Sequence, residues 1–313
     1  MHVREDPDTG LAQIFDRFTP VLTYQHGTNA PGPVLDRIHP DNRKYAIARS
    51  DYLHPLFGPE GESLTRDWSI DHPHHRGIYW AWPEVDCAGV RGDLHALQRI
   101  FANPIGTIQA IDGSERAEMI AESVWVLDHP VGGTNVSPHA PVLLERVLIR
   151  ASTPDPDTRG RAVDLFLRFQ SLGETVVIAR RETDKYGGLN IRLAPIRNQI
   201  LRPHTDPAGT AHPAAWAQIS GIFEGATKPA TLVILQHSQN PQYPGDWVQY
   251  PDLNWLQPTF PAAHARYTID PSHPLTLAYR FWIRPGDAVT DDDARRLWED
   301  FQRVRIPRSL QKP

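Results

Sequence analysis

The stretch VDLFLRFQ, residues 163–170, carries the clearest structural signal in the sequence. Apolar side chains alternate there with polar ones at a period of two, which is the period of a β-strand with one buried face. A second stretch, LTLAYRFWI at residues 275–283, repeats the alternation. The apolar positions of the two stretches are Val163, Leu165, Leu167, Phe169, Leu275, Leu277, Tyr279, Phe281 and Ile283. Both stretches are therefore predicted to be antiparallel strands that line a core.

Segments of the same kind recur along the chain between turn signals. Thirty prolines and twenty-one glycines stand against two methionines, a composition that favours many turns over long helices. The further strand candidates are residues 105–111, 117–127, 143–149, 175–180, 186–193, 217–223 and 230–235. This spacing predicts an all-β protein, with one large antiparallel β-sandwich domain over residues 1–313 and few helices.

The two ends of the chain are expected to differ from this pattern. Residues 1–20 are polar and weakly patterned, and we expect a loose N-terminal arm there. Residues 290–304 predict a helix, because Thr290 is a favourable N-cap and three aspartates follow it at the positive end of the helix dipole. The apolar stripe of this helix consists of Ala294, Leu297, Trp298 and Phe301.

Charge and composition limit the classes of function. The 313 residues carry a net charge of −5, and arginines are interspersed with acidic residues, which argues against nucleic-acid binding. No run approaches the ~18–20 consecutive apolar residues of a membrane span, and the first residues hold no apolar signal-peptide segment. The single cysteine, Cys87, cannot form an internal disulfide. We therefore expect a cytoplasmic protein with a small-molecule partner, and the oligomeric state stays open.

The segment TRDWSIDHPHHRGIYWAW, residues 65–82, concentrates groups that can move a proton, hold a metal or stack on a sugar. His72, His74 and His75 stand within four positions of one another. The proline after His72 biases that residue towards an extended backbone, and in an extended segment the first two rings project to one side and the third to the other. Arg76 carries a permanent charge that can bind a carboxylate or a sugar hydroxyl.

Three chemistries fit this segment. His74 or His75 can act as a general acid or base near neutral pH. His72 and His74, with a neighbouring aspartate, can instead hold a divalent metal, which is the one cofactor that the residues suggest. The histidines can also hydrogen-bond a polar ligand. In a structural alternative, Asp71, His72 and Arg76 form a hydrogen-bonded loop that anchors two sheets.

Trp80 and Trp82 lie on a short strand predicted over residues 78–82. If they line a cleft they can stack on a sugar ring, although large aromatic side chains mostly serve burial. Glu84, just past this strand, is the nearest carboxylate suited to acid–base work, and a solvated turn residue is the alternative. His54, which precedes a proline, is a weaker candidate for ligand binding.

Two further groups lie far along the chain. Tyr186 and Arg192 flank a glycine pair at a strand start, and they can face a ligand or form a cross-strand pair. His237 and Asn240 follow a predicted strand where a long, aromatic-rich loop begins at residues 240–260, and functional groups often lie at such junctions. We predict that this junction and the histidine segment converge on one cleft.

Three motifs resemble those of the bacterial PmoA-family proteins of unknown function. They are YLHPLFGPEGESLTRDWSIDHPHHRGIYWAW at residues 52–82, YGGLNIRL at residues 186–193 and HSQNP at residues 237–241. The similarity covers most of the chain, and HPHHRG is its most specific part. The resemblance implies a galactose-mutarotase-like β-sandwich, a superfamily in which paired histidines and a carboxylate often handle a sugar ring.

The residues and the resemblance together predict a carbohydrate-active enzyme. A histidine of the HPHH segment would act as base or acid with His237 or Glu84 as its counterpart, and Arg76 and Arg192 would bind substrate oxygens. The reaction would be epimerisation or glycoside cleavage, by hydrolysis or by elimination on an oxidised sugar. A non-catalytic sugar-binding protein and a metal-dependent enzyme are the alternatives.

Overall fold

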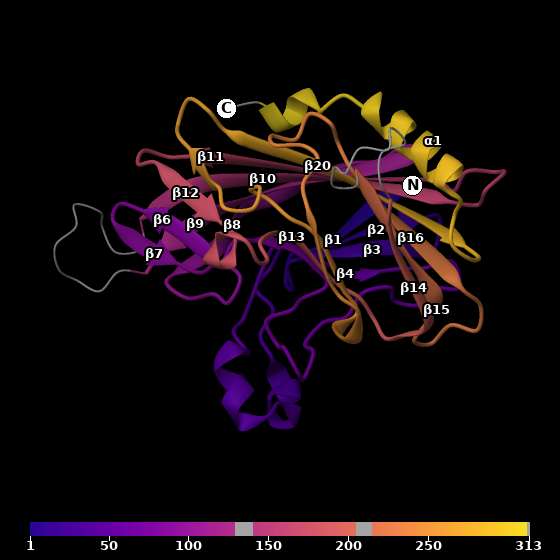
Figure 1. Cartoon of the computed structure of the whole chain (residues 1–313), viewed down its shortest axis with the longest axis horizontal. Helices are drawn as coiled ribbons and strands as arrows, with labels where there is room; N and C mark the ends of the chain where they lie inside the picture. The colour runs from indigo at the N-terminus through magenta and orange to yellow at the C-terminus, as the bar shows by residue number, and fades with distance from the viewer. Residues whose placement is uncertain (129–139, 205–214, 312–313) are drawn as a thin grey trace.

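Two eight-stranded sheets pack into a β-sandwich, and a four-stranded sheet lies beside them (Figure 1). This computed structural model describes residues 1–128, 140–204 and 215–311. The first sheet has the order β1 (His2–Asp6), β2 (Leu11–Asp16), β3 (Thr19–Gln25), β4 (Tyr52–Leu56), β5 (Ile78–Ala81), β13 (Gly188–Arg192), β18 (Trp255–Pro258) and β17 (Trp247–Tyr250).

The second sheet has the order β14 (Ile196–His204), β15 (Trp216–Phe223), β16 (Ala230–Gln236), β20 (Leu275–Pro285), β11 (Arg161–Ser171), β10 (Pro141–Ser152), β9 (Arg116–Leu127) and β8 (Ile100–Ile111). The small sheet has the order β19 (Arg266–Ile269), β12 (Val176–Ala179), β6 (Glu84–Cys87) and β7 (Val90–Gly92). Neighbouring strands run antiparallel, as in β10–β11 and β16–β20.

The two alternating stretches of the sequence lie in β11 and β20, which are neighbours within the second sheet. Their register places Leu165 opposite Tyr279, and both side chains are buried against the first sheet. The period-two pattern thus reports the face that each strand turns to the main core. The prediction of an all-β antiparallel sandwich is confirmed.

α1 (Asp291–Gln302), the one α-helix in the parts of the chain that the structure describes, covers the other face of the second sheet (Figure 1). The Thr290 hydroxyl accepts a hydrogen bond from the Asp293 N–H at 3.1 Å and so caps the first turn. Phe166 of β11 and Phe301 of α1 belong to a second, smaller core beneath the helix. The helix lies where the capping pattern predicts it.

Asp164 illustrates how α1 changes the polar face of the sheet. The alternation places this carboxylate away from the main core, yet it is buried because α1 lies over it. Arg280 pairs with it at 2.6 Å and also with Asp300 of the helix at 2.8 Å. A buried charge needs such a partner, since an isolated one would lose its hydration without compensation.

Residues 1–20 do not form a loose arm. They make β1, β2 and the start of β3, and Ala12 and Ile14 of β2 are fully buried. The N-terminal amine donates to the Gly113 carbonyl at 2.8 Å, which ties β1 to the β8–β9 turn. The prediction is wrong because strands of five and six residues give too few alternating positions to stand out from a polar segment.

Short 3₁₀ segments complete the fold. η1 (Gly32–Arg37) and η2 (Pro40–Tyr45) form the indigo segment that extends away from the sheets in Figure 1. The others are η3 (Arg181–Thr183), η4 (Pro251–Leu253) and η5 (Arg308–Gln311). No helix within residues 1–128, 140–204 and 215–311 is long and apolar enough to span a membrane.

The first sheet determines where the histidine segment lies. The segment leads into β5, whose first residue, Ile78, is paired with Ile191 of β13. The next residue of β13, Arg192, is paired with Trp255, the first residue of β18. The start of β5, the end of β13 and the start of β18 therefore lie side by side, although they are distant in sequence. The candidate site lies at this end of the three strands.

Candidate functional site

The histidine segment forms a tight turn and not an extended stretch. The His75 N–H donates to the His72 carbonyl at 2.9 Å, and Gly77 ends the turn with a positive φ of 59°. A Cβ at Gly77 would lie 2.2 Å from the Leu53 carbonyl oxygen, so glycine is required there by space as well as by conformation. The extended arrangement expected for the three rings does not occur, and all of them line one cavity.

A fourth histidine completes the cluster. His95 lies in residues 93–98, which connect β7 to β8. The ring centroids of His72 and His75 are stacked 4.7 Å apart, and those of His74 and His75 lie 4.5 Å apart, edge to face. The His95 ring lies 5.2 Å from His74 and 5.6 Å from His75. Four imidazoles thus share one small volume.

The cavity that these rings line has a volume of about 630 Å³. The Trp255 ring lies 4.3 Å from His75, and the Tyr186 ring lies 4.9 Å from His95. The other lining residues are Asn42, Tyr45, Asp71, Asp93, Ala96, Gln98, Arg181, Tyr250 and Leu253. A cavity of this size, with aromatic walls and a few polar groups, suits a ligand about as large as a drug molecule or a disaccharide.

Burial keeps the inner imidazoles neutral. It lowers the pKa of His74 to about 3, and the neighbouring His72 and Arg49 add to the effect. The pKa values of His75 and His95 are also held well below the usual value, first by burial and then by the His74 ring. Each neutral ring offers one N–H donor and one lone pair. No hydrogen bond from the described residues engages the Nδ1 atoms of His74 and His75.

Two ion pairs balance the charges of the cavity. Arg192 donates to both oxygens of Asp71, at 2.8 and 3.0 Å, and His72 Nδ1 lies 3.1 Å from the same carboxylate. Burial opposes ionisation of Asp71, but the hydrogen bonds from His72 and Arg192 hold its pKa well below the usual range. Arg181 pairs with Asp93 at 2.5 Å. The cavity therefore presents paired charges, and an ionised Asp71 oriented toward His72.

The structure brings part of the predicted site together. The predicted residues that line the cavity are Asp71, His72, His74, His75 and Tyr186. Arg192 acts behind the lining, through its pair with Asp71, and its Nε and Nη1 atoms are buried without a partner among the described residues. Its predicted contact with substrate oxygens stays a prediction, and in the structure its side chain binds Asp71.

Arg76 and His54 lie outside the cavity lining. Arg76 is fully buried, pairs with Asp67 and lies 3.5 Å over the Trp68 ring. His54 Nδ1 lies 2.9 Å from the Thr65 hydroxyl. Both side chains fasten the loop before β5 to β4. Arg76 thus has an anchoring role, although its partners are Asp67 and Tyr52 and not the Asp71 and His72 of the structural alternative.

Trp80 and Trp82 belong to the core and not to the cavity. The Trp80 indole donates to Glu145 at 2.5 Å, and the Trp82 indole donates to the Phe260 carbonyl at 2.8 Å. Neither indole can therefore stack on a ligand in the cavity of the histidine cluster, although Trp80 lines a separate cavity of about 200 Å³. Trp255 provides the indole of the cavity wall instead.

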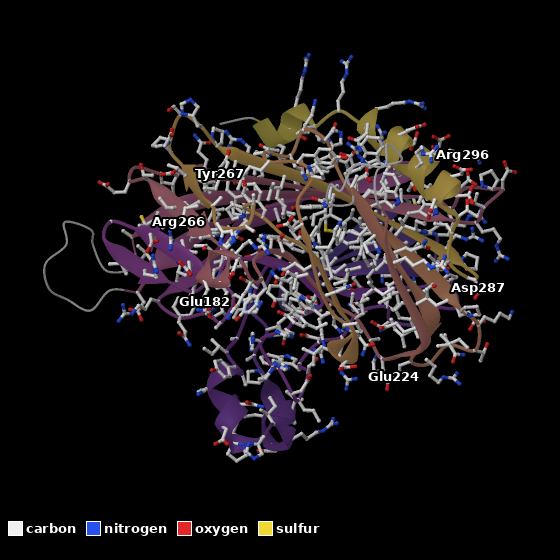
Figure 2. All side chains as sticks on the ribbon, in the orientation of Figure 1. Glu182, Glu224, Arg266, Tyr267, Asp287 and Arg296 are labelled. Atoms are coloured by element: carbon white, nitrogen blue, oxygen red, sulfur yellow. The ribbon has the colours of Figure 1, made fainter. Side chains whose placement is uncertain are left out.

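Glu84 is engaged by neighbours of the small sheet. One carboxylate oxygen accepts from the Glu182 N–H at 3.0 Å, and the other accepts from Arg266 at 2.6 Å. Figure 2 shows Glu182 and Arg266 on the side of the molecule where β6 and β12 lie. Glu84 does not line the cavity, since its two oxygens connect β6 to η3 and β19.

His237 and Asn240 hold α1 and β20 in place. His237 Nε2 lies 3.1 Å from the Val304 carbonyl, and its ring lies 5.0 Å from Phe301. The Asn240 amide makes two hydrogen bonds with the main chain of Ala278, at 2.7 and 3.0 Å. Neither residue lines the cavity of the histidine cluster, so the predicted convergence on one cleft is wrong.

Several cavity residues escape the sequence patterns. His95, in DLHALQ, is a lone histidine with no partner at a recognisable spacing, and Arg181 and Asp93 look like ordinary surface charges. Residues 240–260 do contribute Tyr250, Leu253 and Trp255, as the aromatic content of that stretch suggests, although they form β17, η4 and β18.

A metal ion requires several ligand atoms that converge on one point. Within the described ranges, no group of three histidine, cysteine, aspartate or glutamate side chains has a suitable arrangement. The imidazoles pack against one another by faces and edges. A divalent metal at the HPHH segment stays a prediction.

Comparisons with known proteins give a family but no activity. No curated protein sequence matches. A protein described as a kojibiose phosphorylase from the human microbiome matches with a TM-score of 0.30 and 7% identity, over 75% of this chain and 26% of its own. The GH36 α-galactosidase AgaB of Geobacillus stearothermophilus matches with a TM-score of 0.42 and 9% identity, over 92% of this chain and 41% of its own. The chain thus spans well under half the length of these two enzymes. Residues 16–299 match the profile of DUF6807, a family of unknown function, and the chain belongs to this family.

Proposed function

We propose that the protein is a carbohydrate-active enzyme in which His72 removes a proton from a sugar, for elimination on an oxidised glycoside or for epimerisation. The Asp71–His72 pair carries the proposal. The ionised carboxylate can only accept, so the contact at 3.1 Å assigns the imidazole proton to Nδ1 and leaves the Nε2 lone pair as the base. Arg192 fixes the carboxylate from the other side. The His72 side chain is 41% exposed, as a base that meets a ligand must be.

The base is therefore assigned to His72 and not to His74 or His75. A nitrogen whose pKa lies far below neutral accepts a proton poorly, and burial depresses the pKa of both inner rings. Their neutral N–H groups suit a different role. Removal of a proton next to a carbonyl places negative charge on the carbonyl oxygen, which preorganised donors in a dry site stabilise.

The lining gives no preference to a cationic ligand. Asp71 and Asp93 each have an arginine partner, so no carboxylate of the lining is left to draw a cation. Tyr45, Tyr186 and Tyr250 offer ring faces for the C–H surface of a sugar ring. Asn42 and Gln98 offer amides for its hydroxyls. The resemblance to PmoA-family proteins through HPHHRG, which stays a prediction, points to the same class of substrate.

Two-carboxylate glycoside hydrolysis fits less well. That mechanism needs one carboxylic acid that is protonated near neutral pH and one carboxylate across the scissile bond. The pKa of Asp71 is instead lowered by His72 and Arg192, and Asp93 is bound to Arg181. Proton abstraction by imidazole is the chemistry that these groups support.

The test measures exchange of the sugar proton with solvent deuterium and the products that form. The protein is incubated in D₂O with paired oxidised and unoxidised glycosides, and the sugars are examined by NMR and mass spectrometry. We expect deuterium next to the carbonyl of recovered sugar, or an unsaturated product, with the oxidised member only. His72→Gln should abolish both signals, and His273→Gln, at a side chain 81% exposed in the β19–β20 turn, should not. Binding without exchange or product would favour the sugar-binding alternative, and products free of solvent deuterium would favour hydrolysis.

A further inference from the structure

His95 lies in the loop of residues 93–98 between β7 and β8, and the hydrogen bonds within this loop do not engage the His95 ring. Residues 93–98 are closed by two backbone hydrogen bonds between Asp93 and Gln98, at 2.7 and 2.8 Å, and Asp93 Oδ1 accepts from the Ala96 N–H at 2.8 Å. These bonds shape the loop. They leave the orientation of the His95 side chain, which is 2% exposed, to be fixed from outside the loop.

Arg49 supplies that contact from a distant segment. Its Nη2 donates to the carbonyl oxygens of both Leu94 and His95, at 2.7 Å each, and the residue is only 5% exposed. Its guanidinium carbon lies 4.6 Å from the centroid of the Tyr79 ring. The Tyr79 hydroxyl lies 3.0 Å from His95 Nε2. Arg49 thus binds the backbone of His95 directly, and it packs on Tyr79, which among the described residues makes the hydrogen bond to the His95 ring.

We propose that Arg49 is a positioning residue that, together with Tyr79, holds the His95 imidazole in the cavity with its Nδ1–H directed to a ligand. The pKa of Tyr79 is raised by burial, so its hydroxyl keeps its proton and can donate to Nε2. When the Tyr79 hydroxyl donates in this way, the neutral His95 ring carries its own proton on Nδ1. The importance of this for turnover rests on the proposed function, but the positioning itself does not.

Packing alone would not keep the loop in place. On the side away from the histidines, Leu94 and Leu97 line a second cavity of about 200 Å³ together with Arg49. A loop with space behind it can shift once the bonds to its carbonyls are lost. The Leu94 N–H also donates to the Trp82 carbonyl at 3.0 Å, and Arg181 pairs with Asp93. Of these restraints on the loop, the hydrogen bonds from Arg49 are the ones that reach the main chain of His95.

The charge of Arg49 also acts on His95. Burial lowers the pKa of Arg49 to about 10, which still leaves it charged at neutral pH. The other titratable groups around His95 are His72, His74, His75, Tyr79, Asp93, Arg181 and Tyr186. Burial first, then His74, Arg49 and Arg181, hold the pKa of His95 well below its usual value. Removal of the Arg49 charge should therefore let His95 take up a proton at higher pH.

The experiment measures the His95 ring in the full-length protein by ¹⁵N NMR, with its signals assigned from His95→Gln. In Arg49→Met we expect shifted Nδ1 and Nε2 signals and protonation at higher pH than in the wild type. Turnover of any active sugar should fall on the order of 100-fold, mainly in kcat. Arg49→Lys, which keeps the charge, should keep His95 neutral to low pH. Arg280→Met, at an equally buried arginine outside the cavity, should leave the His95 signals unchanged.

Unchanged His95 signals in folded Arg49→Met would overturn the proposal. Should that variant fail to fold, Tyr79→Phe keeps the ring and removes the hydroxyl, and it should move the Nε2 signal. An unmoved Nε2 signal would equally refute the arrangement. If no sugar is turned over by the wild type, the proposed function fails while these spectra still decide the role of Arg49.

Discussion

Replacement of Gly77 by alanine tests whether the turn that carries the histidines is as constrained as its geometry implies. The φ of 59° costs an alanine about 1–2 kcal/mol. The new Cβ would also lie 2.2 Å from the Leu53 carbonyl oxygen and 2.8 Å from the His54 Cβ, so β4 must move. Such overpacking costs about 1–3 kcal/mol more. Hydrogen bonds from Gly77 to Arg66 and from Arg192 to Gly77, both 2.8 Å, oppose relaxation.

We therefore expect Gly77→Ala to lower the free energy of unfolding by about 2–5 kcal/mol, measured by urea denaturation. Gly89→Ala is the matched control, because Gly89 has a φ of 79° and no atom within 4 Å of the added Cβ. It should lose only about 1–2 kcal/mol. Equal losses in the two variants would refute the close approach of the turn to β4 as a source of constraint.

Three further predictions concern the imidazoles and the cavity. Because His74, His75 and His95 stay neutral when folded but take up protons when unfolded, stability should fall as the pH drops below about 6.5, by up to about 1.4 kcal/mol per pH unit for each ring. Urea denaturation at pH 7.5 and pH 5.5 measures this change in the free energy of unfolding. His95→Gln should lose less stability than the wild type between these two pH values, and an equal loss would contradict the prediction. His237→Ala should cost about 1–3 kcal/mol through its bond to Val304 yet leave ligand affinity unchanged in calorimetric titration, whereas a lost affinity would return His237 to the site. Tyr250→Ala, at a residue 43% exposed on the cavity wall, should weaken sugar binding by about 1 kcal/mol without lowering the melting temperature, and a stability loss with full affinity would count against it.

The fold could be predicted where a strand turns one regular face to the core. The alternation in β11 and β20 is long enough to be read directly. It says nothing about Asp164, whose burial depends on α1 packing over the sheet. The short strands β1 and β2 do not stand out in the sequence for a different reason, since five and six residues give too few alternating positions.

The site could be predicted best where its residues are adjacent in sequence. The rings of His72, His74 and His75 share a cavity because one tight turn carries them. The loop of residues 93–98 brings His95 to the cavity, and the pairing of β18 with β13 brings Trp255 there. Neither arrangement can be recognised from the spacing of residues in the sequence. The same limit applies to Trp80 of β5 and to Trp82 just after it, because a strand that is buried on both faces gives no sign of which side opens to a cavity.

The charge of Arg49 can act on the reaction as well as on the position of His95. Arg181 and Arg192 each have a carboxylate partner, and Arg49 has main-chain carbonyls as its hydrogen-bond acceptors among the residues described. Among the described residues no carboxylate hydrogen-bonds this buried charge, although Asp93 acts on it electrostatically. A low-dielectric interior makes the charge of Arg49 act strongly over several ångströms. Negative charge that develops on a sugar oxygen during proton removal would be stabilised by it. Arg49→Lys should accordingly keep more of kcat than Arg49→Met, and equal losses would show that the hydrogen bonds to residues 94 and 95, and not the charge, are what the reaction requires.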